Sequence, residues 1–226
     1  MASSTVEQYI KTIFHESARR EDDILSMKHL SQAMGVAPGT ATAMVKHLAQ
    51  RQLITYVPRR GVILTPQGQQ LAITIIRRHR LIETFLEQVL GYDWGEVHDD
   101  AERLEHAVSD RFIERLDAYL GHPQADPHGA PIPTAQGEIS APKTTTLDQQ
   151  EVGGHVTISR VDASDPNFLE LLKDNLVTPG EVFIVEDRND LAGTISLRHE
   201  ESGNTLVIGT DQGTRIHGKP NPAESR

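Results

Sequence analysis

The spacing of apolar residues changes once along the chain, and this change divides it into two kinds of structure. Up to about residue 120, apolar side chains recur at helical spacing. From Gly153 onward they occur in short runs separated by turn residues, which indicates short strands. Residues 121–147 between these parts are rich in Pro, Gly, His, Thr and Ala and show no period, as expected of a linker. The sequence therefore predicts a helical N-terminal part and a small β-rich C-terminal part.

The first 65 residues predict three helices followed by a hairpin. Ser26 is a typical N-cap residue, and Pro38 fits the first turn of a helix. The hairpin connection is Pro58-Arg59-Arg60-Gly61. The expected helices cover 6–19, 26–34 and 40–52, and the expected strands cover 53–57 and 62–65. This order of elements is typical of a winged helix-turn-helix.

The residue types at the start of the third expected helix predict a DNA-binding surface. Its first residues are small, so the helix can enter the major groove, and threonine methyl groups can contact thymine methyl groups. Lys46 would lie beside a phosphate, and the hairpin arginines would reach the backbone or the minor groove. Helix-turn-helix segments also occur in bundles that bind only protein, so this alternative stays open. The candidate DNA-contacting residues are Pro38, Gly39, Thr40, Thr42, Ala43, Lys46, Arg59 and Arg60.

The charges are distributed unevenly. The formal net charge is −10, yet residues 1–90 carry 11 Lys and Arg against 7 Asp and Glu, whereas residues 91–226 carry 11 against 25. A positive N-terminal module with an acidic remainder suits a protein that offers one face to phosphates. No run of about 18 apolar residues exists, and the N-terminus has no signal-peptide pattern, so we expect a cytoplasmic protein that does not bind membranes.

Histidines and carboxylates cluster on two expected helices, at about 65–90 and 96–120. His79 and Glu83 stand four residues apart, so they share a helical face. The second helix carries His98, Glu102, Glu105 and His106, also at helical spacing. Such pairs often form surface hydrogen bonds only, but clustered carboxylates repel one another unless a cation intervenes. Because the chain has no cysteine, a metal site here would consist of histidine and carboxylate ligands.

Three stretches give the chain a resemblance to the diphtheria toxin repressor family of iron- and manganese-dependent regulators. They are IIRRHRLIETFL (75–86), GYDWGEVHDDAERLEHAVSD (91–110) and HPQADPHGAPIP (122–133). The resemblance covers nearly all of 5–135 and extends more loosely to 153–218. It implies a winged helix-turn-helix at 1–70, a helical metal-binding and dimerization domain at 71–135, a linker at 136–152 and an SH3-like (FeoA-like) barrel at 153–218.

The resemblance also implies two metal ions per subunit. Glu102, Glu105 and His106 would form most of the primary site, and His79, Glu83 and His98 most of the ancillary site. A glutamate at position 102, where the iron-responsive branch has cysteine, is similar to the manganese-responsive branch. We therefore expect Mn²⁺, with Fe²⁺ as the alternative, because carboxylates suit a hard cation.

The first helix departs from the family pattern. Gln8 stands where the family supplies an aspartate or methionine ligand, and Glu7 lies beside it. An amide oxygen can coordinate a metal ion, so Gln8 remains a candidate ligand without charge. In the C-terminal part, Asp165 is a further candidate for the ancillary site. His122 and His128 are expected to have a structural role or none.

These observations predict a homodimeric, metal-dependent repressor that binds double-stranded operator DNA and controls genes of metal homeostasis. A metal ion would tie the first helix to the metal-binding helices and fix the separation of two recognition helices. A metallohydrolase is one alternative, but the sequence has neither a nucleophile motif nor a phosphate-binding loop, so we do not expect an enzyme. A winged-helix regulator that senses an organic ligand is a second alternative.

Overall fold

The computed structural model describes residues 3–18, 20, 22–140, 142–162 and 165–221, and it divides the chain into two compact units. One unit contains the residues up to His79 together with 103–113 and 133–139. The other contains 80–102, 114–132 and the residues from 140 onward. Boundaries between the units fall within helices as well as in loops.

The first unit begins with the expected winged helix-turn-helix. Helices α1 (Ser4–Ser17), α2 (Met27–Ala33) and α3 (Pro38–Gln50) precede strands β1 (Ile54–Val57) and β2 (Gly61–Leu64). The N-caps of α1 and α2 are Ser3 and Ser26, and Pro38 occupies the first turn of α3. Strands β1 and β2 pair antiparallel and form the wing. All five elements lie close to the predicted residues.

The core of this module is formed by the apolar faces of its helices and the wing. Ile10 and Ile13 of α1, Leu48 of α3 and Val62 of β2 are fully buried within one cluster. Burying these side chains supplies the main stabilisation of the module. Helices α1 and α3 thus contribute to one hydrophobic cluster.

Three further helices follow the wing. They are α4 (Pro66–Gln88), α5 (Val97–Leu104) and α6 (Asp110–Tyr119). The single helix expected at 96–120 is therefore wrong, because a turn that includes Glu105 and His106 separates α5 from α6. The hydroxyl of Ser109 accepts a hydrogen bond from the backbone N–H of Phe112 at 3.2 Å, which caps the start of α6.

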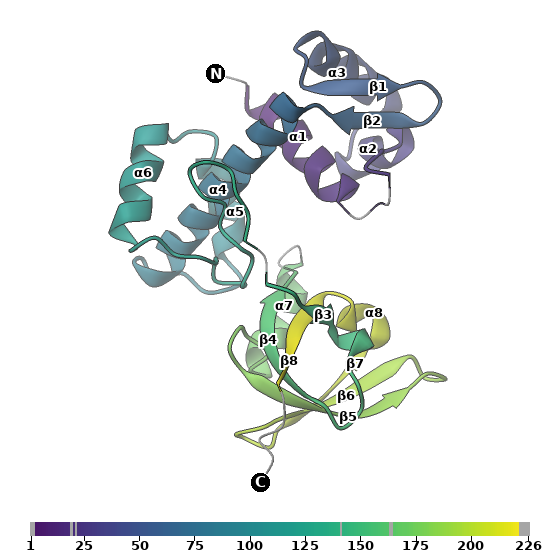
Figure 1. The fold of residues 1–226 in the computed structure, drawn as a ribbon, viewed down its shortest axis with the longest axis vertical. Coiled ribbons are helices and arrows are strands. Elements are labelled where there is room, and N and C mark those ends of the chain that lie inside the picture. Colours follow the sequence, from purple (N-terminus) through teal and green to yellow (C-terminus); the bar gives the residue numbers. More distant parts are fainter. Residues whose placement is uncertain (1–2, 19, 21, 141, 163–164, 222–226) are drawn as a thin grey trace. The chain divides into compact units, whose positions relative to one another are not determined.

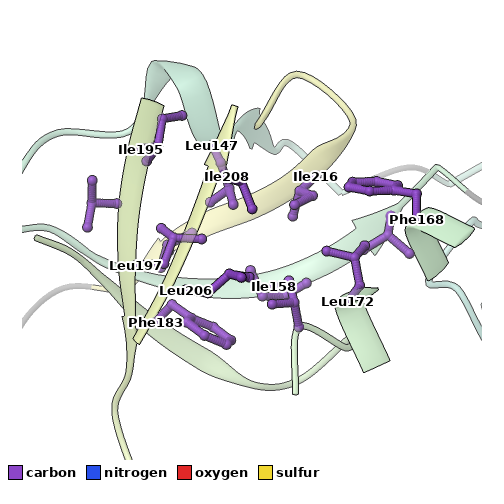
Figure 2. Close-up of a cluster of buried hydrophobic side chains, with 14 of the residues drawn as sticks. Leu147, Ile158, Phe168, Leu172, Phe183, Ile195, Leu197, Leu206, Ile208 and Ile216 are labelled. Atoms are coloured by element: carbon purple, nitrogen blue, oxygen red, sulfur yellow. The ribbon is translucent and has the colours of Figure 1, made fainter. Parts of the chain in front are cut away.

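The C-terminal part forms an antiparallel sheet with the strand order β3-β8-β4-β5-β6-β7 (Figure 1). Apolar residues on alternate positions of the strands point inward, where Figure 2 shows Phe183, Ile195 and Leu197 together with Phe168 and Leu172 of the neighbouring helix. The strands are β3 (Thr145–Thr146), β4 (His155–Val161), β5 (Val182–Asn189), β6 (Thr194–His199), β7 (Thr205–Gly209) and β8 (Ile216–Asn221), and the helices are η1 (Leu147–Gln149), α7 (Pro166–Asp174) and α8 (Thr210–Gly213).

Two expectations for this part are corrected. Residues 219–221, which lie beyond the expected barrel at 153–218, belong to β8 and pair with β4, while residues 222–226 lie outside the described residues. Thr145 and Thr146, within the expected linker, pair with β8, and Leu147 is fully buried in the barrel core. These segments were missed because they lack a long apolar run, and their positions are fixed by pairing with distant strands.

Candidate metal centres and DNA-contacting surface

Glu105 is the centre of a buried polar cluster in the first unit. Its side chain is completely buried, and its Oε2 lies 2.6 Å from Nδ1 of His79. The ammonium of Lys11 donates to both of its carboxylate oxygens at 2.9 Å, and lies 3.3 Å from Nδ1 of His79. A carboxylate buried in this way requires positive charge beside it, which Lys11 provides.

Helix α1 contributes a second carboxylate to the same unit. Oε2 of Glu7 lies 2.7 Å from Nδ1 of His106, and the Glu7 side chain is buried. Nε2 of His106 lies 3.4 Å from Oε1 of Glu105. The side-chain oxygen of the neighbouring Gln8 is inaccessible to solvent. Two carboxylates, an amide and an imidazole thus come from α1 and from the turn after α5.

His98 lies between two carboxylates in the second unit. Its Nδ1 is 3.3 Å from Oε1 of Glu83, and its Nε2 is 3.4 Å from Oε2 of Glu102. The hydrogen bonds that the ring of His98 donates to Glu102 and Glu83 raise the pKa of His98 to about 10. The two carboxylates therefore hold a proton on the imidazole, and a metal ion bound at His98 would have to displace it. The resemblance groups Glu102 with Glu105 and His106, whereas here its carboxylate contacts His98.

Asp126 and His128, from the segment after α6, lie next to Glu83 of this cluster. Glu83, Asp126 and His128 are all buried, and each offers a ligand atom within 4.8 Å of the others. Burial, followed by the negative charge of Glu83, raises the pKa of Asp126 to about 6, although Arg80 opposes this shift. Nε of Arg80 lies 3.6 Å from Oδ2 of Asp126.

The ring of His128 is oriented as in a metal ligand. Its Nε2 lies 2.9 Å from the carbonyl oxygen of Trp94 and donates to it, while Nδ1 is buried and has no hydrogen-bond partner. A hydrogen bond to a carbonyl on one ring nitrogen orients the ring so that the other nitrogen can face a metal ion. Together with carboxylate oxygens, this donor set fits a hard or borderline divalent cation.

The remaining candidate residues near these clusters have other contacts. Oδ1 of Asp165 caps α7 by accepting from the backbone N–H groups of Asn167 and Phe168 at 3.1 and 3.4 Å. Nη1 of Arg215 lies 3.6 Å from its Oδ2. His122 is exposed, and its Nδ1 lies 2.9 Å from Oδ2 of Asp117. The N-cap role and the ion pair with Arg215 explain the position of the Asp165 side chain. The ion pair with Asp117 explains that of His122.

The expected DNA-contacting residues are exposed on α3 and on the wing. The hydroxyl of Thr42 donates to the carbonyl oxygen of Pro38 at 2.8 Å, so the hydroxyl proton is engaged in a hydrogen bond within the helix. Nη2 of Arg60 lies 2.5 Å from Oδ2 of Asp22, and Arg59 takes a left-handed conformation at the wing tip. His47, one turn after Ala43, is exposed as well. The exposed candidates are Pro38, Gly39, Thr40, Thr42, Ala43, Lys46, Arg59 and Arg60.

Three family models match the chain in the order of these structural parts. Residues 1–62 match the N-terminal DNA-binding domain of iron-dependent repressors, and residues 65–134 match their metal-binding and dimerisation domain. Residues 145–219 match the FeoA domain. The chain belongs to the iron-dependent repressor family. It is thus a DNA-binding, metal-dependent transcriptional repressor and not an enzyme, which excludes the metallohydrolase alternative.

Several named relatives resemble this repressor over most of its length. The diphtheria toxin repressor of Corynebacterium glutamicum is 32% identical over 80% of this chain and 74% of that protein. The diphtheria toxin repressor of Corynebacterium diphtheriae is 28% identical over 90% of this chain and 92% of that protein. The iron-dependent repressor IdeR of Mycobacterium tuberculosis is 32% identical over 57% of this chain and 55% of that protein.

Solved structures of manganese regulators also resemble the repressor. A manganese-dependent transcriptional repressor in complex with manganese has a TM-score of 0.88 and 37% identity, and the match covers 96% of this chain and all of the other. The manganese regulator SloR has a TM-score of 0.78 and 32% identity over 96% of this chain and 98% of its own. The fold class expected from the sequence is confirmed. Within the described residues of the repressor, no helix is both long and apolar enough to cross a membrane.

Three residues of these clusters, Glu7, Asp126 and His128, are not among the ligands expected from the sequence. The helical period identifies pairs on one helix, such as His79 and Glu83, but not contacts between distant segments. The signal for Asp126 and His128 was their place in the stretch HPQADPHGAPIP (122–133), which carries part of the family resemblance.

Proposed function

We propose that this repressor responds to manganese, with iron as the alternative, and binds operator DNA as a homodimer when it is loaded with metal. In this proposal it acts in the cytoplasm on genes of metal homeostasis. The observation that supports manganese is the donor chemistry of the two clusters, which consists of carboxylates and imidazoles in a chain without cysteine. Oxygen-rich sites suit Mn²⁺ better than sites with thiolate ligands do.

Each cluster would hold one ion, which gives two ions per subunit. Glu105, His106, Glu7 and Gln8 would hold the first ion, together with Glu102 as the resemblance implies. Glu83, His98, Asp126 and His128 would hold the second, together with His79 as the resemblance implies. When bound, the cation supplies the positive charge that lets carboxylates from separate segments share one site.

The first cluster is connected to the DNA-contacting helix by packing. Glu7 and Gln8 lie on α1, whose Ile10 and Ile13 belong to the same core as Leu48 of α3. Ligands on α1 would therefore restrict α3 and favour one spacing of the two recognition helices in a dimer. This preorganisation converts metal affinity into DNA affinity.

The test is calorimetric titration of the metal-free protein with Mn²⁺ and, under anaerobic conditions, with Fe²⁺. We expect two binding events per subunit. Glu105→Gln should remove one event and Asp126→Asn the other, because each variant loses one ligand charge at nearly constant shape. Asp165→Asn is the matched control, since asparagine is also a good N-cap, and it should keep both events.

DNA binding is measured in parallel by fluorescence anisotropy, with a duplex selected from random sequences by the metal-loaded protein. Mn²⁺ should induce binding at a lower free concentration than Fe²⁺ does, and Glu105→Gln should abolish the metal response. The absence of any metal-binding event, or DNA binding that is independent of metal, would contradict the proposal and favour a regulator that senses an organic ligand. Induction by Fe²⁺ at the lower concentration would select the iron alternative.

A further inference from the structure

Among the residues that the structure describes, Lys11 is the only lysine that is buried. Its side chain is 8% exposed on α1, and its ammonium donates to both oxygens of Glu105 at 2.9 Å. Most lysines keep the ammonium in water, because burying the charge is costly unless an opposite charge compensates it. This pair therefore binds α1 firmly to the turn that follows α5.

The pair has a consequence for metal binding, which rests on the proposed function. Glu105 is a proposed ligand of the first ion, and both of its oxygens already accept hydrogen bonds from the ammonium. A divalent cation that binds either oxygen must displace Lys11 or lie next to its positive charge. Like charges in a buried site raise the free energy of the occupied state.

Helix α1 thus carries a proposed ligand and a competing cation on one face. Glu7 and Lys11 are four residues apart, so both point toward the same part of the unit. Glu7 contacts His106, and Lys11 contacts Glu105. These pairs connect α1 to residues 105 and 106. Metal binding would replace one attachment of α1 by another.

We propose that Lys11 is a built-in competitor of the metal ion at Glu105, and that it sets the metal concentration at which the first site fills. Its ammonium neutralises Glu105 in the metal-free protein and leaves the carboxylate when the divalent cation binds. A lysine suits this exchange, because its single charge lies at the end of a flexible chain of four methylene groups.

The first test measures Mn²⁺ binding to Lys11→Met in the full chain by calorimetry. Methionine has a similar length and no charge, so the event at Glu105 should become at least about tenfold tighter, within the usual range of coupling between two sites. The event that depends on Asp126 should not change. Without Mn²⁺, the variant should melt at a lower temperature than the wild type, and Mn²⁺ should raise its melting temperature by a larger amount.

Two matched variants separate the charge of Lys11 from other effects. Lys28→Met removes the same charge from the exposed face of α2 and should leave both binding events and the melting temperature unchanged. Lys11→Gln keeps a group that donates to Glu105 but has no charge. It should therefore also tighten Mn²⁺ binding and serves as the test if Lys11→Met does not fold.

A readout on the wild-type chain requires no substitution. The ammonium of a buried lysine exchanges its protons slowly, so Lys11 should give an NMR signal distinct from those of exposed lysines. Cd²⁺, a diamagnetic probe, should shift or remove this signal in proportion to the occupancy of the first site.

The outcomes distinguish this proposal from the proposed function. If the wild-type chain binds no divalent cation, the proposed function fails. If the wild type binds Mn²⁺ but the folded Lys11 variants bind it equally or more weakly, the competitor role is wrong and the proposed function stands. A Lys11 ammonium signal that is unchanged when Cd²⁺ saturates the first site would overturn the competitor role in the same way.

Discussion

Gly129 fixes the segment that carries Asp126 and His128 against strand β4. Its φ is +83°, and a Cβ at this position would lie 2.0 Å from the carbonyl oxygen of Ser159. The backbone N–H of Val161 donates to the carbonyl oxygen of His128 at 2.9 Å. The positions of the two candidate ligands therefore depend on a residue that has no side chain.

Replacing Gly129 with alanine should destabilise the protein and weaken the second metal site. The new methyl group overlaps backbone, which cannot yield easily, so we expect a loss of at least about 3 kcal/mol in the free energy of unfolding. The measurement is thermal and urea unfolding together with Mn²⁺ calorimetry. Gly121→Ala is the control, because Gly121 has a φ of +74° but open space around it, and should cost only about 1 kcal/mol. Equal effects of the two substitutions would contradict this packing argument.

Gly39 presents the opposite case. It lies in the first turn of α3, is exposed, and has no atom within 4 Å of the position that a Cβ would take. The fold therefore does not require glycine here. A missing side chain on the proposed DNA-contacting surface would instead allow the DNA backbone or a base edge to approach closely.

Gly39→Ala should separate folding from DNA binding. We expect the free energy of unfolding to change by no more than about 1 kcal/mol, in the direction of greater stability, because alanine favours helices. Operator affinity should fall about tenfold, as it does when one good contact is lost. Fluorescence anisotropy with the selected duplex measures this affinity. Unchanged affinity would show that the helix does not approach DNA at this residue.

The candidate ligands show how far single residues can be predicted from the sequence. His79 and Glu83 lie on one helix, so their spacing predicts their common face. The contact between Lys11 and Glu105 joins residues 94 positions apart, and no period relates such residues. Tertiary packing alone brings Lys11 to the site.

At the scale of secondary-structure elements, the boundary between α5 and α6 could not be predicted from the helical period. Apolar residues continue at helical spacing on both sides of the turn, so the pattern predicted one helix. The turn matters for the candidate site, since Glu105 and His106 lie in it rather than on a helix. The winged helix-turn-helix was predictable because a serine N-cap, a proline in a first turn and a short hairpin each have a local cause.

The wing is connected to the loop between α1 and α2 by an exposed ion pair. Arg60 and Asp22 have side chains that are 57% and 52% exposed. The hydrogen bond from the Ile24 backbone N–H, and to a smaller extent the guanidinium of Arg60, hold the pKa of Asp22 below its usual value. Since water screens this pair, it should contribute little to stability. DNA phosphates can compete for the same arginine.

Asp22→Asn should increase DNA affinity. The substitution removes the carboxylate that competes with phosphate for Arg60, so we expect a gain of no more than about fivefold. The dependence of affinity on salt should become steeper. Asp23→Asn is the control, because it removes the same charge from the neighbouring residue. An equal gain in both variants would indicate a general effect of net charge instead of a release of Arg60.

At the scale of the whole molecule, α6 has exposed apolar residues that a dimer would cover. Phe112 is 47% exposed and Tyr119 is 70% exposed, and both lie within the family's dimerisation domain. They are seven residues apart, so they share one face of the helix. Exposed aromatic residues on one face are typical of a protein interface.

Tyr119→Glu should weaken the homodimer by at least about tenfold, because a charge would be buried at the interface. Sedimentation velocity measures this change, and operator affinity should fall with it. Leu191→Glu is the control, since Leu191 is fully exposed in the turn between β5 and β6. A dimer that is insensitive to Tyr119→Glu would exclude this face of α6 as the interface.

The division of the chain into a helical part and a β-rich part was predictable from composition and periodicity. The role of the segment between these parts was not. Proline and glycine in 121–147 predicted a linker, yet Thr145 and Thr146 pair with β8, and the carbonyl oxygen of His128 pairs with β4. Short segments that complete a sheet need only a few backbone hydrogen bonds, so they carry little pattern of their own.

Trp94 is the only tryptophan of the chain, and it lies beside a candidate ligand. Its ring centroid is 4.9 Å from that of His128, and its indole N–H donates to the carbonyl oxygen of Pro127. The tryptophan fluorescence of the protein therefore originates from one position at the second cluster. Paramagnetic Mn²⁺ bound there would quench this emission. The emission intensity of an unlabelled sample would therefore report metal binding at the second cluster in real time.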